Sequence, residues 1–167
     1  MGIKFGSFGF DDLKQKVKSM SSGQTVSDQE MERWLSYIGE ELCNHARTIT
    51  SGHASGGYDD QTGNLRSSIG YRIYNNAEAV KDGGFQNVTV TNPKGETVTG
   101  DGVDDAKKAL DNYGLAHEIP VNGWTLVIVA GMSYATYVEA KGYNVLHLTQ
   151  IEMSDKIAEL KKDLGLK

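Results

Sequence analysis

The segment 27–49 constrains the fold more than any other part of the chain. Its apolar residues recur with the helical period over about five turns, which places one stripe on a single side of a helix. The stripe consists of Met31, Trp34, Leu35, Ile38, Leu42, Ala46 and Ile49. Ser27 and Glu30 precede it and form a capping box, since each side chain can accept a hydrogen bond from the other residue's amide. We therefore expect a long amphipathic helix that must pack against a core.

Strand patterns in the second half of the chain supply a partner for that helix. Apolar and other side chains alternate over 68–74, where Ile69, Tyr71 and Ile73 share one face. The segment 124–129 is a nearly unbroken apolar run rich in β-branched residues, which predicts a central strand. Between them, 88–99 carries the turn sequence Asn-Pro-Lys-Gly and many threonines, which predicts a solvated hairpin.

Three further segments have helical spacing. The first is 10–20, with Phe10, Leu13, Val17 and Met20 on one side; the second is 103–113, with Val103, Ala106, Leu110 and Tyr113; the third is 153–164, with Met153, Ile157, Leu160 and Leu164. Asp101 and Asp104 are expected to cap the middle helix, and Gly114 stands where a left-handed C-cap would end it.

Together these patterns predict an α+β fold: a small, largely antiparallel sheet with helices packed on one face, a long helix in the N-terminal half and a C-terminal helix. With 167 residues, the chain is expected to form a single domain over 1–167. It contains 20 glycines but only two prolines, and the glycine-rich segment 51–64 is expected to be a surface loop.

The charge and the cysteine count exclude several classes of protein. The formal net charge of −5 argues against a general nucleic-acid coat or a membrane-surface role. A single cysteine, Cys43, cannot form an internal disulfide, which argues against a small secreted scaffold. No apolar run is long enough for a bilayer and no signal-peptide block is visible, so we expect synthesis in the cytoplasm.

No pattern of catalytic or metal-binding residues stands out. The four histidines are scattered, and Cys43 and His45 lie two residues apart, which puts them on different sides of a helix. The acidic run 101–105 lacks the ligand spacing of a calcium loop, and the glycine-rich pieces at 51–57 and 81–84 lack a phosphate-loop lysine. We therefore predict a protein that is not an enzyme, with no catalytic, metal-binding or cofactor-binding residues.

Three segments carry a resemblance to a known family. They are 10–14 (FDDLK), 62–69 (TGNLRSSI) and 131–142 (GMSYATYVEAKG). In this order and spacing they resemble the head–tail joining family of tailed bacteriophages, whose members are small neck, tail-completion, minor capsid or minor tail proteins. The second motif is the most specific of the three.

The resemblance implies a structural virion protein of a phage or prophage. Such a subunit would form a homo-oligomeric ring in the neck that joins tail to head, contact other phage head-completion and tail proteins, and meet DNA only as passing cargo. It would reside in the virion and, during assembly, in the host bacterial cytoplasm, without membrane partners. A tail-completion, neck or tail-terminator position fits equally, and the segment 75–121 is longer than the family's core requires and is interpreted as an insertion.

The motifs provide the candidate assembly residues, which are Gly63, Asn64, Leu65, Arg66, Tyr134, Tyr137 and Glu139. Leu65 is expected to pack inward from a turn, and Tyr134 and Tyr137 to hold a short helix against the sheet. A purely structural role for both motifs is an alternative; Arg66 and Glu139 are the better interface candidates. The segments 51–64 and 82–102 are expected to become ordered on docking.

One alternative is a small enzyme or ligand-binding domain. Its pocket would lie over the sheet and be lined by Trp124, Tyr71 and Tyr113. A closed pocket with convergent polar groups would favour this alternative, and ring-shaped oligomers would favour assembly.

Overall fold

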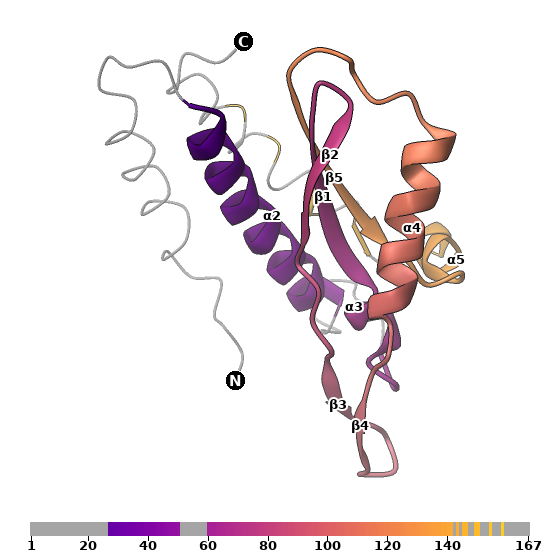
Figure 1. Ribbon diagram of the computed structural model, residues 1–167. Coiled ribbons are helices and arrows are strands. Elements are labelled where there is room, and N and C mark those ends of the chain that lie inside the picture. Colours follow the sequence, from indigo (N-terminus) through magenta and orange to yellow (C-terminus); the bar gives the residue numbers. More distant parts are fainter. Residues whose placement is uncertain are drawn as a thin grey trace.

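The computed structural model describes residues 27–50 and 60–141, and thereafter positions 143, 145, 146, 149, 150, 154 and 158. In chain order the elements are α2 (Asp28–Thr50), α3 (Asn64–Ser67), β1 (Ile69–Asn75), β2 (Glu78–Gly83), β3 (Thr89–Thr91), β4 (Thr97–Thr99), α4 (Val103–Ala116), β5 (Trp124–Ala130) and α5 (Ala135–Ala140) (Figure 1). The expected helix at 10–20 lies outside the described residues, as does most of the one at 153–164.

The long helix α2 confirms the prediction from the apolar stripe. The capping box is present: the Ser27 amide donates to the Glu30 carboxylate at 2.9 Å and the Glu30 amide donates to the Ser27 hydroxyl at 3.3 Å. The predicted stripe is buried from Met31 to Ala46, while the side chain of Ile49 lies outside the described part. Cys43 is also fully buried beside the stripe.

The main sheet has the order β2-β1-β5 and is antiparallel throughout. The expected strands at 69–73 and 124–129 are both present, but β1 is the central strand and β5 lies at an edge of the described sheet. The prediction of a central position for 124–129 was therefore wrong. Its continuous apolar run has another cause, because helices cover both faces of β5.

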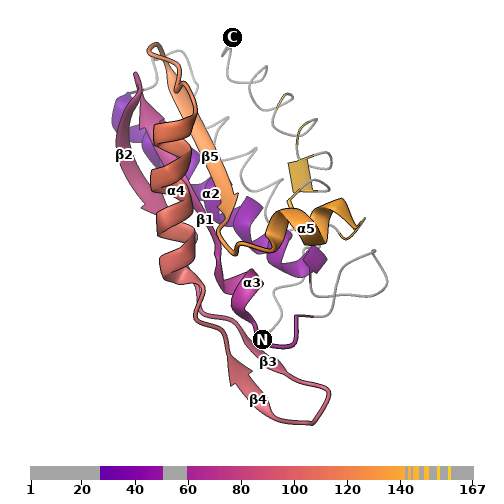
Figure 2. The same cartoon turned by 90° about the vertical axis from the view of Figure 1, so that its right-hand side faces the viewer.

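The two faces of the sheet carry separate cores. On one face, α2 packs over Ile69, Tyr71 and Ile73 of β1 and over alternate residues of β5. On the other face, Leu110 of α4 packs against Tyr74, Val127 and Val129. The α+β class with a small antiparallel sheet is confirmed, but α2 and α4 cover opposite faces instead of sharing one (Figures 1 and 2).

Helix α4 confirms the predicted helix at 103–113 but differs from the expectation at both ends. Gly102 is its N-cap residue and no side chain caps it, so Asp101 and Asp104 do not serve as caps. The helix continues through Gly114 to Ala116. A Cβ on Gly114 would lie 2.9 Å from the hydroxyl oxygen of Tyr74, so close packing on β1, instead of a left-handed cap, explains this glycine.

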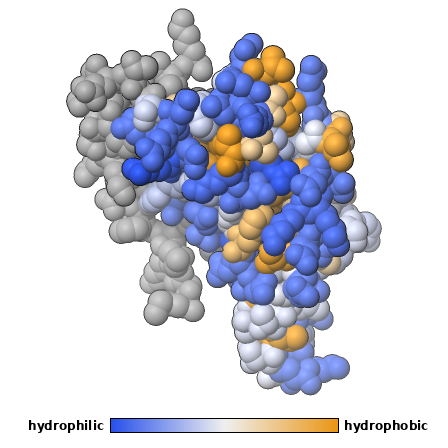
Figure 3. All heavy atoms as spheres, in the orientation of Figure 1, coloured by the Kyte–Doolittle hydropathy of each residue, from blue (hydrophilic) through white to orange (hydrophobic). Residues whose placement is uncertain are grey.

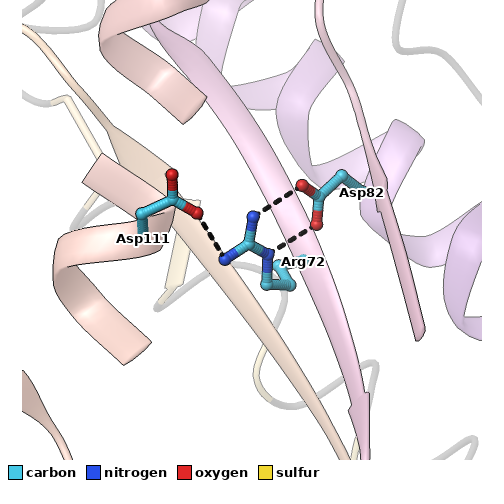
Figure 4. A network of polar contacts seen from close by, with 3 residues as sticks. All are labelled: Arg72, Asp82 and Asp111. Atoms are coloured by element: carbon cyan, nitrogen blue, oxygen red, sulfur yellow. Dashed lines mark hydrogen bonds and ion pairs between the residues drawn. The ribbon is translucent and has the colours of Figure 1, made fainter. Parts of the chain in front are cut away.

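An ion cluster joins three elements on the α4 side of the sheet. Arg72 of β1 makes two hydrogen bonds to Asp82 of β2, at 2.6 and 2.7 Å, and an ion pair with Asp111 of α4 at 2.9 Å (Figure 4). The guanidinium group thus ties the edge strand β2 and the helix α4 to the central strand.

The predicted hairpin is present as β3 and β4, which form a separate two-stranded sheet. It projects beyond the end of the main sheet in both ribbon views (Figures 1 and 2). The segment 75–121 contains this hairpin together with β2 and α4, and the last two belong to the main sheet and its second core. Among the described helices none has the length and apolarity needed to cross a membrane.

Candidate functional site

The two segments 62–69 and 131–142 meet in the structure, although they are far apart in the sequence. Leu65 is fully buried and forms a small core with Ala135 and Val145. The Ser68 carbonyl accepts a hydrogen bond from the Gly131 amide at 2.8 Å, and the Ser68 hydroxyl accepts one from the Met132 amide at 3.2 Å. The start of β1 is therefore bonded directly to the segment that links β5 to α5.

A buried carboxylate organises the turn before α3. Asp60 accepts hydrogen bonds from the Gly63 amide at 2.9 Å and from the Arg66 amide at 3.2 Å. Tyr134 lies against the same turn: burial and the negative charge of Asp60 raise the pKa of its hydroxyl group, while a hydrogen bond with Thr62 lowers it. Asp60 thus satisfies two amides near the start of a very short helix, and Tyr134 covers the turn.

The same turn holds the base of the β3–β4 hairpin. The Asn64 side-chain oxygen accepts from the Asp101 amide at 2.9 Å, and the Ser67 hydroxyl accepts from the Val88 amide at 2.8 Å. Across the base, the Gly100 amide donates to the Val88 carbonyl at 2.8 Å. Both strands of the hairpin are therefore fixed to the motif where they leave the body.

Four of the candidate residues take part in the packing and hydrogen bonds around the turn before α3. Gly63 and Leu65 are buried, and the side chain of Asn64 is occupied by the hairpin base. Tyr134 is half-buried against the turn before α3. These four residues hold the local structure together.

Of the other three candidates, Arg66 and Glu139 are half-buried and Tyr137 is exposed. The Nε of Arg66 is buried without a hydrogen-bond partner in the described part of the protein. Glu139 accepts from the Leu146 amide at 3.2 Å and so ties α5 to the chain that follows. Tyr137 is 63% exposed, and the Lys141 ammonium group lies 5.3 Å from its ring centroid. Tyr137 alone of the seven offers a large exposed apolar side chain.

A buried arginine on α2 was missed by sequence reasoning. The Arg47 guanidinium group donates to the carbonyls of Arg66, Ile69 and Gly84, and burial lowers its pKa. Glu40, on the same side of α2, accepts from the Gly84 amide at 2.9 Å. Glu40, Cys43 and Arg47 follow each other at spacings of three and four residues, and this second stripe beside the apolar one is the signal that could have revealed the contact.

The three aromatic residues of the alternative pocket do not come together. Tyr71 and Trp124 pack on the α2 face of the sheet. Tyr113 packs on the α4 face, where its ring stacks on His117 with centroids 4.0 Å apart. Because the sheet separates them, these rings cannot line one pocket.

The described residues contain no group of three or more His, Cys, Asp or Glu side chains that could hold a metal ion. Burial raises the pKa of the Cys43 thiol to about 12, so it is protonated and a poor nucleophile at neutral pH. Comparisons with protein-family models, curated proteins and solved structures found no match to the chain.

Proposed function

We propose that the chain is a structural subunit of a tailed bacteriophage or prophage particle, which forms a ring at the head–tail junction and joins the tail to the head. The observation that carries the proposal is the contact between 62–69 and 131–142. These are the two segments that most resemble the head–tail joining family, and they pack as one unit through Leu65, Ser68 and Tyr134. The pairing of Ile69 with Ala130 brings the two segments side by side, and their apolar and hydroxyl side chains fill the contact between them.

The surface around α5 supports an assembly role. Tyr137 and Tyr143 are both large, exposed aromatic residues, and the Tyr143 amide bonds to the Val138 carbonyl at 3.3 Å, which keeps it beside α5. Tyrosine is enriched at protein interfaces and among the residues that carry most of their binding energy. We assign this surface to contact with a neighbouring subunit or another neck protein.

The electrostatics are compatible with a channel for DNA. A subunit with a formal net charge of −5 gives a ring little general attraction for phosphates, so DNA would pass without being held by counterion release. A ring whose lumen is lined by lysine and arginine would contradict this part of the proposal.

The proposal is tested with the purified full-length chain. Sedimentation over a range of concentrations, together with negative-stain electron microscopy, is expected to give a concentration-dependent multimer and ring-shaped particles. Tyr137→Ala is expected to weaken assembly about tenfold or more, as truncation of a central interface tyrosine does, whereas the neighbouring exposed Thr136→Ala should not.

A complementation assay separates a phage role from self-association alone. When the phage lacks its own copy, the intact chain should restore joined particles, and Tyr137→Ala should leave separate heads and tails. A chain that is monomeric at every concentration and does not restore particles would overturn the proposal.

A further inference from the structure

Strand β5 has an open edge in the described part of the protein. On one side, all its residues from Trp124 to Ala130 pair with β1 in a continuous antiparallel register. On the other side, no described strand pairs with it, so within the described residues the backbone N–H and C=O groups along this edge have no strand partner. Such an edge is a template for another strand.

Within the described residues, β5 itself carries none of the usual sequence features that prevent strand pairing. Proteins generally protect sheet edges with charged side chains, proline or bulges. The opposite edge strand, β2, contains Glu78, Lys81 and Asp82, and its register shifts between Ile73 and Tyr74 of β1. Strand β5, with the sequence WTLVIVA, has no charge, no proline and no register shift against β1.

The β3–β4 hairpin has the complementary property. Thr89, Thr91, Thr97 and Thr99 lie on one face, and Val90 and Val98 pair on the other. The hairpin's described contacts with the body lie at its base, and beyond the base its two strands pair mainly with each other. A two-stranded hairpin is marginally stable alone, but here its base fixes its direction.

The surface chemistry of the hairpin also suits strand pairing. Its charged residues are Lys94 and Glu96, both in the turn at its tip, so its strands are as uncharged as β5. In Figure 3 the hairpin carries mostly pale, near-neutral side chains, whereas hydrophilic side chains dominate the visible body.

We propose that a strand of the β3–β4 hairpin in one copy of the chain pairs with the open edge of β5 in the next copy. The hairpin points away from its own sheet, so it cannot reach its own β5 (Figures 1 and 2). Each copy offers one β3–β4 hairpin, here called the arm, and one open β5 edge. A head-to-tail contact between copies uses both. A head-to-tail contact of this kind closes into a ring when the rotation between copies permits. The inference rests on the proposed self-assembly and specifies the surfaces that carry it.

Cross-linking between two marked chains tests the pairing directly. One full-length variant carries Thr97→Cys in the arm and the other carries Thr125→Cys on β5, while the native Cys43 is buried. A short bismaleimide linker should give covalent dimers in the mixture of the two variants, well above the yield in either variant alone. Dimers formed equally by either variant alone would indicate a symmetric contact and overturn the proposal, as would a multimer without arm-to-edge cross-links.

A second variant removes the arm and keeps the body. Because the Gly100 amide already donates to the Val88 carbonyl, replacing 89–99 with Asn-Gly closes the base with a two-residue turn. We expect the same helical circular-dichroism signal as the full chain and assembly weakened by about 100-fold, since several main-chain hydrogen bonds are lost. The matched control Lys94→Ser changes only the tip and should assemble normally.

The outcomes separate the two proposals. Unchanged assembly of the arm-less chain overturns the hairpin contact and leaves the ring proposal standing. A full chain that never forms multimers overturns both.

Discussion

At the scale of single residues, Gly63 is held by two independent constraints. Its φ of 73° lies in the left-handed region, and a Cβ there would approach the Val88 carbonyl oxygen to 2.3 Å. The glycine of the TGNLRSSI motif therefore allows both the turn before α3 and the close approach of the hairpin base. The candidate site depends on this backbone contact as much as on any side chain.

Alanine substitutions at two glycines can separate these constraints. Gly95, in the hairpin turn, has a φ of 80° but nothing within 4 Å of an added Cβ. Gly95→Ala should lower the free energy of unfolding by about 1 kcal/mol, the cost of a left-handed alanine. Gly63→Ala adds a backbone clash and should lower it by roughly 3 kcal/mol or more.

Urea denaturation of both variants, followed by circular dichroism, provides the measurement. Equal losses at the two positions would mean that the hairpin base moves aside easily, and would contradict the tight packing at the motif.

Sequence reasoning reached some residues of the site and not others. The burial of Leu65 could be predicted. A leucine that follows turn-forming residues and precedes an alternating strand is expected to pack with the apolar face of that strand. The hydrogen bond from the Asp101 amide to the Asn64 side chain could not be predicted. The two residues are 37 positions apart, and nothing in the sequence around an asparagine identifies its partner. Arg47 was missed because a charged residue beside an apolar stripe usually lies at the surface.

At the scale of elements, β2 was the strand that the sequence pattern did not predict. Its residues Glu78 to Asp82 are exposed, so they show no apolar alternation. The turn that connects it to β1 consists of Asn76 and Ala77, with φ values of 50° and 66°. A two-residue hairpin turn of this kind usually contains glycine. Because alanine stands there instead, the usual Asn-Gly turn sequence is absent. By contrast, α2, β1, α4 and the β3–β4 hairpin were predicted, because each has a clear period or turn sequence.

The attachment of β2 depends strongly on the Arg72 cluster. The Arg72 side chain is 15% exposed, and Asp82 and Asp111 together raise its pKa. Replacing it with methionine keeps most of the aliphatic stem but leaves two carboxylates without their cation. We expect Arg72→Met to lower the free energy of unfolding by about 2 kcal/mol. Asp111→Asn should cost less than about 1 kcal/mol, because Asp111 is 64% exposed.

The double variant of Arg72 and Asp82 provides the control. Arg72→Met with Asp82→Asn should be more stable than the sum of the two single losses implies, because neither partner is then left unpaired. Strict additivity in urea denaturation would show that the two side chains do not interact energetically.

At the scale of the whole molecule, the sheet lies between two cores that involve different helices. The α2 core is the larger and includes Cys43 and Tyr71, whose ring lies against the backbone of Gly39 and Gly83. Burial raises the pKa of Cys43 from 9.0 to about 12, and burial followed by the charge of Glu40 raises the pKa of Tyr71 from 10.0 to about 12. The free energy of unfolding of the whole domain is therefore expected to depend on pH in the alkaline range.

The direction of the pH dependence follows from these pKa values. Between pH 9 and 12 the unfolded chain loses the Cys43 proton while the folded chain retains it. Stability from this group is therefore fully present below pH 9 and falls as pH rises, with a slope approaching about 1.4 kcal/mol per pH unit. Tyr71 should add to the loss above its ordinary pKa of 10.0.

Cys43→Ala isolates the thiol from every other group that titrates in this range. At pH 7.5 the variant should be less stable than the native chain, because a fully buried side chain has been shortened. That difference should shrink as pH rises from 9 to 11, since only the native chain carries the thiol. Urea denaturation under reducing conditions at four pH values measures it. A difference that stays constant with pH would mean that Cys43 ionises equally in the folded and unfolded states, and that water reaches the α2 core beside Gly84.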